Sequence, residues 1–105
     1  MNDKEMLKEL RKLLTDTFPG QIEKIILFGS RAYGKAANDS DYDVLIVLKS
    51  GYNWRLKQSI QETCWEIDYK YDILTDVKII SAAELQTIRG KQPYITTALQ
   101  DGIAL

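Results

Sequence analysis

Two short apolar runs, separated by a small and polar stretch, restrict this chain to a fold with a small β-sheet. The first run, IEKIILF at 22–28, is rich in Ile and ends at Gly29, and the second, DYDVLIVLK at 41–49, has a mostly apolar body. Runs of this length, bounded by glycine and polar residues, are typical of β-strands. We therefore expect two neighbouring strands joined by a glycine-marked loop over 30–40.

Helical periodicity lies on either side of these strands. Residues 3–18 carry apolar side chains at three- and four-residue spacings, and Pro19-Gly20 ends the pattern. The same period returns over 54–69, with one apolar side that we expect to face the sheet.

The last third of the chain predicts one more strand and two short helices. The run YDILTDVKII at 71–80 has the composition of a strand, and Ser81 with Glu84 has the form of a capping box that begins a short helix. A loop is expected over 89–93 and a last helix over 94–100. This order of elements predicts an α+β fold in which helices flank a small mixed sheet.

Composition limits both the size and the chemistry of the protein. With 105 residues, the chain is expected to form one domain over 1–105. It contains no His, which excludes imidazole catalysis and most zinc sites, so carboxylates must carry any chemistry. Cys64 is alone, no charged and apolar leader is present, and no apolar run could span a membrane, so we expect a cytoplasmic protein. The net charge of −1 makes nucleic acid an unexpected partner.

Two acidic residues at the start of the second strand are candidate metal ligands. Asp41 and Asp43 are two residues apart, so both side chains project from one face of a strand, with Cα atoms roughly 7 Å apart. Hard oxygen ligands without His match Mg²⁺ or Mn²⁺, and the matching chemistry is phosphoryl or nucleotidyl transfer. An ordinary pair of acids at a strand entrance is the alternative interpretation.

The turn after the first strand is a candidate phosphate site. At Gly29 the backbone can come close to a ligand, and the Ser30 hydroxyl with the following N–H groups can hold phosphate. Arg31 and Lys35 lie in the same loop, where a cation could neutralise the β- or γ-phosphate. A simple turn with solvated charges is the alternative.

Taken together, the string GSRAYGKAANDSDYDVLIVL resembles the signature of the minimal nucleotidyltransferases of the DNA polymerase β superfamily. The resemblance implies a palm-like nucleotidyltransferase core, with Gly29 and Ser30 on the nucleotide phosphates and Asp41 and Asp43 on Mg²⁺. It also implies ATP or another NTP as the donor, with loss of pyrophosphate after attack on the α-phosphorus.

The family usually adds a third carboxylate from the next strand, which acts on the acceptor hydroxyl. The predicted strand at 71–80 offers Asp72 and Asp76, both on one face by parity. We favour Asp76, because similar numbers of apolar strand residues follow Asp43 and Asp76, which would place the two acids at similar depth in neighbouring strands.

The resemblance also implies a partner. Small members of the family often pair with a HEPN-type protein and act as antitoxins by adding AMP to a partner tyrosine, and a second copy of the chain is the other source of an acceptor surface. The predicted helix at 54–69 carries Trp54, Trp65 and Tyr69 on a side distinct from its apolar face, and such aromatic residues mark an interface if they are exposed.

Two other functions compete with this hypothesis. One is a catalytically degenerate module that inhibits a partner sterically, and the other is nucleotidylation of a small molecule in a pocket built by a dimer. The intact Asp41 and Asp43 pair argues against the first, since adjacent like charges call for a cation.

Overall fold

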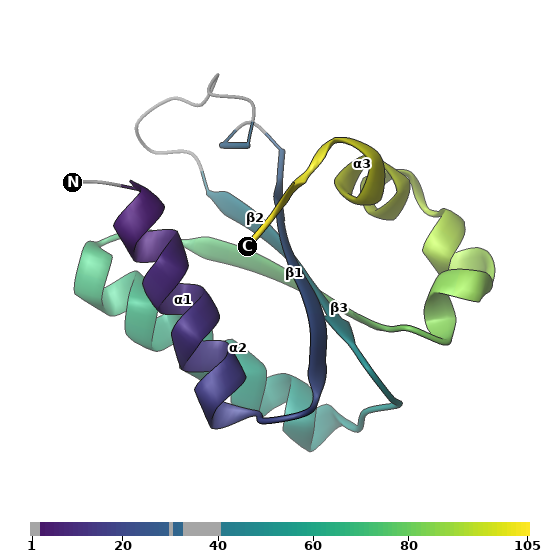
Figure 1. Ribbon diagram of the computed structural model, residues 1–105, viewed down its shortest axis with the longest axis horizontal. Coiled ribbons are helices and arrows are strands. Elements are labelled where there is room, and N and C mark those ends of the chain that lie inside the picture. Colours follow the sequence, from purple (N-terminus) through teal and green to yellow (C-terminus); the bar gives the residue numbers. More distant parts are fainter. Residues whose placement is uncertain (1–2, 30, 33–40) are drawn as a thin grey trace.

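A computed structural model describes residues 3–29, 31–32 and 41–105 of the chain. Four strands form one mixed sheet in the order β3-β2-β1-β4 (Figure 1). The antiparallel partners β1 (Ile22–Phe28) and β2 (Tyr42–Leu48) form its centre, and β3 (Thr75–Ser81) runs parallel to β2. The short strand β4 (Ile103–Ala104) adds antiparallel to β1 at the opposite edge.

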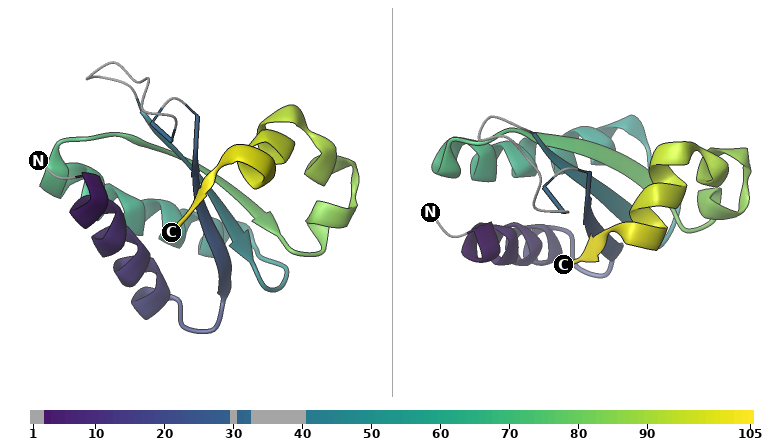
Figure 2. Two further views of the ribbon diagram at one scale, coloured as in Figure 1. Left: turned by 45° about the horizontal axis from the view of Figure 1, so that its top comes forward. Right: turned by 90° about the horizontal axis from the view of Figure 1, so that it is seen from above.

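Two long helices, α1 (Asp3–Thr17) and α2 (Trp54–Tyr71), lie side by side on one face of the sheet (Figure 2). The periodicity of α1 buries Met6, Leu10 and Leu14 completely, and Phe18 follows them into the same core. The inward residues of the strands complete this core, namely Ile25, Leu27, Tyr42, Val44, Ile46, Leu48, Val77 and Ile79. Alternation along each strand sends every second side chain to this face.

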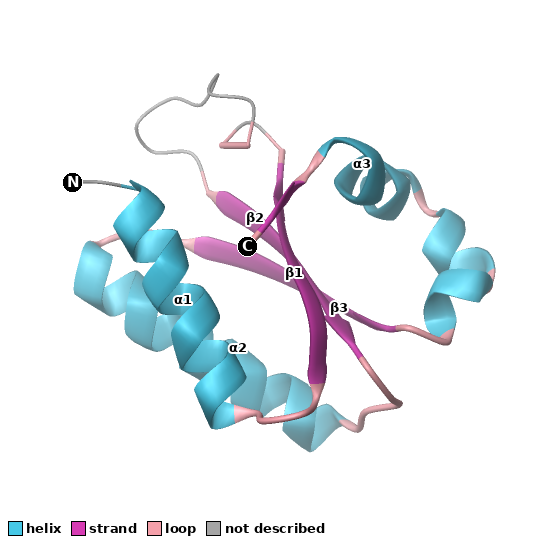
Figure 3. Cartoon of the chain, in the orientation of Figure 1, coloured by secondary structure: helices cyan, strands magenta, loops and turns pink. Residues whose placement is uncertain are grey.

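The opposite face carries a smaller core under the C-terminal part of the chain. Two 3₁₀ helices (Glu84–Gln86 and Ile88–Lys91) lead into α3 (Pro93–Asp101), which packs against β1 (Figure 3). Ile95 and Ala98 of α3 meet the other strand side chains, namely Ile26, Phe28, Leu45, Val47 and Ile80. The central strands β1 and β2 are therefore covered on both faces, which explains their nearly continuous apolar sequences.

The α+β architecture with a small mixed sheet is confirmed. The reciprocal hydrogen bonds expected between Ser81 and Glu84 are also present, but Ser81 is the last residue of β3, and the N-cap of the 3₁₀ helix is Ala83. The Glu84 backbone N–H donates to Ser81 Oγ at 3.2 Å, and the Ser81 N–H donates to Glu84 Oε1 at 3.1 Å. The helix that follows is 3₁₀, and the loop expected over 89–93 is mostly a second 3₁₀ turn. The strand β4 was not predicted, because two residues are too short for a periodic signal.

One predicted boundary was wrong. The strand expected over 71–80 begins only at Thr75, because α2 continues to Tyr71 and ends at Asp72. Asp72 has φ 52° and ψ 51°, and its backbone N–H donates to the Asp68 carbonyl, which is a left-handed helix C-cap.

Among the described residues, none of the helices has the length and apolar character needed to cross a membrane.

Candidate active site

The parallel register of β2 and β3 places two carboxylates side by side. Asp43 is the second residue of β2 and pairs with Asp76, the second residue of β3. Neighbouring strands lie about 4.8 Å apart, so the two side chains leave the sheet from adjacent positions. Both lie on the face that carries α3, because the flanking residues Val44 and Val77 belong to the core under α1 and α2.

Asp41 precedes β2 and is exposed, and it has the same parity as Asp43. Its negative charge is one of the causes that raise the pKa of Asp43, after burial and the charge of Asp76. The sequence motif and the strand pairing therefore bring Asp41, Asp43 and Asp76 to one end of the sheet.

Gly29 shapes the floor beside these acids. It directly follows Phe28, the strand partner of Asp43, and has φ +75°, a conformation that L side chains rarely adopt. A Cβ atom at this position would overlap the Asp43 carboxylate oxygen Oδ2. The glycine is thus required twice, once for the left-handed turn and once for the close approach of the carboxylate to the backbone.

The environment of Asp43 disfavours a lone negative charge. Burial raises the pKa of Asp43 above its usual range, and the charges of Asp76 and Asp41 raise it further, while Lys78 lowers it. Lys78 Nζ lies 3.3 Å from Asp76 Oδ1, from a position two residues further along the same face of β3. The ammonium of Lys78 is therefore a neighbouring cation of the acidic group.

The donor set fits a hard divalent cation. Adjacent carboxylates offer the oxygen ligands that Mg²⁺ and Mn²⁺ prefer, and a cation would offset the repulsion that raises the pKa of Asp43. In the positions found here, no three acidic or thiol side chains among residues 3–29, 31–32 and 41–105 converge closely enough to form a complete ligand group. The sheet holds Asp43 and Asp76 next to each other, and Asp41 lies at an exposed position just before β2.

The predicted phosphate-binding residues divide into three cases. Gly29 lies at the acidic end of the sheet, as described above, whereas Ser30 and Lys35 fall outside the described residues. Arg31 lies on the other face, because its guanidinium stacks over the Tyr42 ring with 4.3 Å to the ring centroid and Tyr42 belongs to the core under α1 and α2. Arg31 is therefore not brought together with the carboxylates.

Asp72, the alternative third acid, is not on a strand at all. Its left-handed backbone conformation ends α2, and its exposed side chain lies ahead of the register that aligns Asp43 with Asp76. The parity argument that placed Asp72 and Asp76 on one face of a strand fails, because only Asp76 belongs to β3.

Two residues near the site were missed by sequence reasoning. Lys78 could have been found from its parity with Asp76. Asp68 is buried on α2, and its Oδ2 accepts hydrogen bonds from the Thr75 N–H at 3.2 Å and the Thr75 hydroxyl at 3.1 Å. These bonds tie Thr75, the first residue of β3 and the residue before Asp76, to α2. The available signal for Asp68 was its position four residues, or one helical turn, after Cys64, which puts a charged residue on the buried side of the helix.

Comparison with known proteins assigns the family. The model of the nucleotidyltransferase domain matches residues 5–102. A Methanocaldococcus jannaschii protein named "Putative protein adenylyltransferase MJ0604" is 30% identical over 105 residues, 100% of this chain and 99% of its own length. A second from that organism, "Putative protein adenylyltransferase MJ0141", is 37% identical over 70 residues, 67% of this chain and 71% of its own length.

Solved structures share the fold. A mutant of the toxin-antitoxin MntA-HpeT has a TM-score of 0.62 at 18% identity, with 99% of this chain and 72% of that chain covered. A toxin-antitoxin structure with AMP-PNP has a TM-score of 0.63 at 21% identity, with 92% and 69% covered. With the family match over nearly the whole sequence, and the full-length relative, the chain belongs to the nucleotidyltransferase domain family, among the minimal nucleotidyltransferases that its motif resembles.

Proposed function

We propose that this nucleotidyltransferase is metal-dependent and transfers AMP from ATP to a hydroxyl group of a partner protein. The observation that carries the proposal is the in-register pairing of Asp43 with Asp76 beside Gly29. The choice of AMP and of a protein acceptor is supported by the names of the two relatives, each of which begins "Putative protein adenylyltransferase".

Each site residue has a defined role in this proposal. Asp41, Asp43 and Asp76 would hold Mg²⁺ or Mn²⁺, and the bound ion would supply positive charge for the α-phosphate and the departing pyrophosphate. Gly29 and Ser30 would hold the triphosphate through backbone N–H groups and the hydroxyl, with Arg31 and Lys35 as candidate phosphate partners from the same loop. Arg31 would have to leave Tyr42 for that role.

Asp76 is suited to act on the acceptor. Its side chain is 46% exposed on an edge strand, so a hydroxyl group from another protein can reach it. The acceptor oxygen attacks the α-phosphorus, the bond from that phosphorus to the bridging oxygen breaks, and pyrophosphate leaves. Asp76 accepts the hydroxyl proton. Lys78 must release Asp76 before that carboxylate can serve.

The partner is proposed from chemistry and likeness together. The structural neighbours are toxin-antitoxin proteins, and one contains the ATP analogue AMP-PNP. We therefore propose a tyrosine of a HEPN-type toxin as the acceptor and an antitoxin role for this chain in the cytoplasm.

The ion pair between Lys78 and Asp76 favours one alternative. If Lys78 permanently neutralises the acidic group, the chain would inhibit its partner by steric contact and transfer nothing. This alternative predicts that partner binding survives every substitution of the acidic residues and that no nucleotide is transferred by the unaltered protein.

The test is transfer of label from ATP to proteins that copurify with the chain. Label at the α-phosphate should appear on the acceptor in the presence of Mg²⁺ or Mn²⁺, and label at the γ-phosphate should not. The double variant Asp41→Asn, Asp43→Asn and the single variant Asp76→Asn should each lose transfer by at least about a hundredfold, the typical scale of a positioned general base.

Asp72→Asn is the matched control, since it makes the same chemical change at the C-cap of α2 and should retain full activity. Transfer of the γ label would contradict nucleotidyl transfer, and loss of transfer in Asp72→Asn with full activity in Asp76→Asn would reverse the assignment of the third acid. Mass spectrometry of the labelled acceptor identifies the modified hydroxyl.

A further inference from the structure

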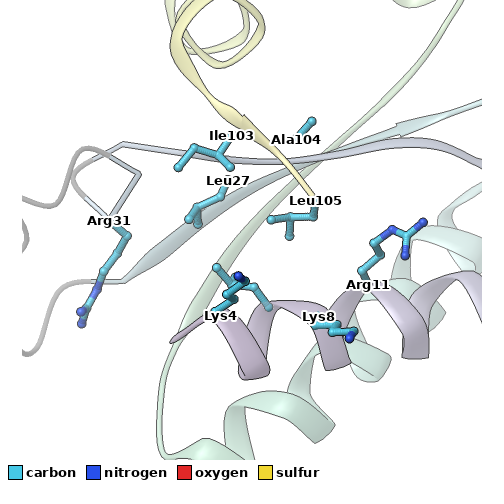
Figure 4. Close-up of a pocket in the computed structure, with 9 residues that line it drawn as sticks. Lys4, Lys8, Arg11, Leu27, Arg31, Ile103, Ala104 and Leu105 are labelled. Atoms are coloured by element: carbon cyan, nitrogen blue, oxygen red, sulfur yellow. The ribbon is translucent and has the colours of Figure 1, made fainter. Parts of the chain in front are cut away.

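A groove with a volume of about 760 Å³ lies between α1 and the β1–β4 edge, on the face of the sheet opposite to Asp43 and Asp76 (Figure 4). Its apolar lining comes from α1, β1 and the C-terminal residues, namely Leu7, Leu27, Ile103, Ala104 and Leu105. Ile103 remains 46% exposed there although it is a large apolar residue. The groove therefore presents apolar surface that no described part of the chain covers.

The rim of the groove is strongly basic. Lys4, Lys8 and Arg11 project along one side of α1, and Arg31 stands at the end near the Gly29 turn (Figure 4). Spacings of four and three residues place the three α1 cations on one helical face. None of the described lining residues has an acidic side chain, although the whole chain has a net charge of −1. Four of the 14 Lys and Arg side chains of the protein, namely Lys4, Lys8, Arg11 and Arg31, therefore line this one groove.

The arrangement of helices on this face of the sheet indicates which kind of element could bind in the groove. On this face of the sheet α1 and α2 lie side by side, and the position next to α1, over the β1–β4 edge, holds no further helix in the described chain (Figure 2). Because β4 has only two residues, the edge offers little backbone for an added strand. A helix packed beside α1 would instead bury its apolar side chains in the groove.

We propose that this groove is the docking site for an amphipathic helix with acidic residues along its edges, contributed by the protein that accepts the nucleotide. An apolar floor between cationic rims is complementary to such a helix. The helices of this chain fit poorly, because the exposed side of α2 carries Arg55 and Lys57 as well as Glu62 and Glu66. A nucleic-acid backbone would leave the apolar floor unused. This inference rests on the proposed function in one respect only, namely that the protein contributing the helix is also the one that accepts the nucleotide.

The experiment uses a fluorescent helical peptide with Leu along one face and Glu along both edges. Its binding to the full chain is measured by anisotropy and mapped by backbone amide NMR shifts. We expect binding that weakens at high salt, with shifts at Leu7, Leu27 and Ile103. A peptide with Lys in place of every Glu should bind at least about tenfold more weakly.

Two variants locate the site. Lys8→Glu with Arg11→Glu should weaken binding of the acidic peptide by about tenfold or more, and Ile103→Glu should do the same by charging the apolar floor. The matched control, Lys57→Glu with Lys91→Glu, makes the same change of charge at exposed positions outside the groove and should bind normally.

Other ligands of the groove would give different results in these experiments. Equal binding of both peptides, or shifts confined to other surfaces, would overturn the proposal. So would an oligonucleotide that displaces the peptide and binds more tightly, or self-association of the chain that Ile103→Glu abolishes. All groove variants should keep stabilisation by Mg²⁺ and ATP, so a failure of the groove proposal is separate from a failure of the proposed nucleotide site.

Discussion

At Asp43 the stability of the fold conflicts with the proposed chemistry. Burial and the charges of Asp76 and Asp41 raise the pKa of Asp43, so the folded protein binds more protons than the unfolded chain between the usual carboxyl pKa and this higher value. Stability is therefore present at low pH and is lost as the pH rises through that window. At neutral pH the ionised carboxylate destabilises the fold unless a cation binds.

Asp43→Asn should consequently stabilise the metal-free protein at neutral pH while abolishing transfer. We expect a gain of about 0.2–1 kcal/mol, the range of cross-strand pairs, and little gain at a pH low enough to protonate both states. Urea unfolding at neutral and acidic pH measures the change. Glu23→Gln, an exposed position on β1, is the control for loss of one charge. A loss of stability at neutral pH in Asp43→Asn would show that Asp76 and Asp41 do not repel the Asp43 carboxylate.

Gly29→Ala tests the close approach of Asp43 to the backbone. Gly20 has nearly the same conformation, φ +74°, but a Cβ atom there would meet open space. Gly20→Ala should cost about 1–2 kcal/mol for the left-handed backbone and leave nucleotide binding intact. Gly29→Ala should cost more and weaken Mg²⁺-dependent ATP binding, because its methyl group displaces the Asp43 carboxylate. Equal effects of the two substitutions in unfolding and titration calorimetry would refute the overlap.

At the scale of elements, α2 has a buried apolar side and an exposed aromatic side. Ile60, Cys64 and Ile67 are buried against the sheet, whereas Trp65 is 56% exposed and Tyr69 is 93% exposed. Burial also raises the pKa of the Cys64 thiol to about 12, so this cysteine is an unreactive part of the core. The exposed aromatic side that the sequence indicated is therefore present and is available to a partner.

Substitutions on the two sides of α2 should differ in their effect on folding. Trp65→Ser should change the free energy of unfolding by less than about 0.5 kcal/mol, because the ring packs little against the protein. Ile67→Ala should cost about 2–5 kcal/mol through lost burial and a cavity. Chemical unfolding of both variants provides the comparison. A large loss of stability in Trp65→Ser would mean that the aromatic side supports the fold and is not a free interface.

At the scale of the whole molecule, nucleotide binding should be visible as stability. A ligand that binds only the folded state at a hundred times its Kd adds about 2.7 kcal/mol, and in a domain of this size each kcal/mol raises Tm by about 4–8 °C. ATP with Mg²⁺ should therefore raise Tm markedly in the unaltered protein. Thermal unfolding with each of the four NTPs, with and without Mg²⁺, also ranks the bases.

The double variant Asp41→Asn, Asp43→Asn is the control for the metal-dependent part of this shift. It should lose the additional stabilisation that Mg²⁺ provides, and any shift produced by the nucleotide alone should persist. The absence of any shift in the unaltered protein at millimolar ATP would contradict a nucleotide site that the chain completes by itself.

Local structure was largely predictable because it depends on local periodicity. The spacing of Met6, Leu10 and Leu14 predicted α1, the apolar runs predicted β1 and β2, and the spacing of Ser81 and Glu84 predicted the reciprocal hydrogen bonds that the structure contains. The end of α2 was not predictable in this way, because only the backbone conformation of Asp72 decides between helix cap and strand.

The sequence by itself determined the class of fold, the D-x-D pair and the resemblance to nucleotidyltransferases, since all three depend on residues that are close along the chain. Tertiary structure decided the rest. The parallel pairing of β2 with β3 fixed the register that sets Asp76 beside Asp43, which the apolar runs after the two acids had only indicated. The packing of Tyr42 drew Arg31 to the opposite face. The return of the C-terminus to β1 formed the basic groove. These placements depend on contacts between distant segments, and the period of a single segment carries no record of the register in which it will pair.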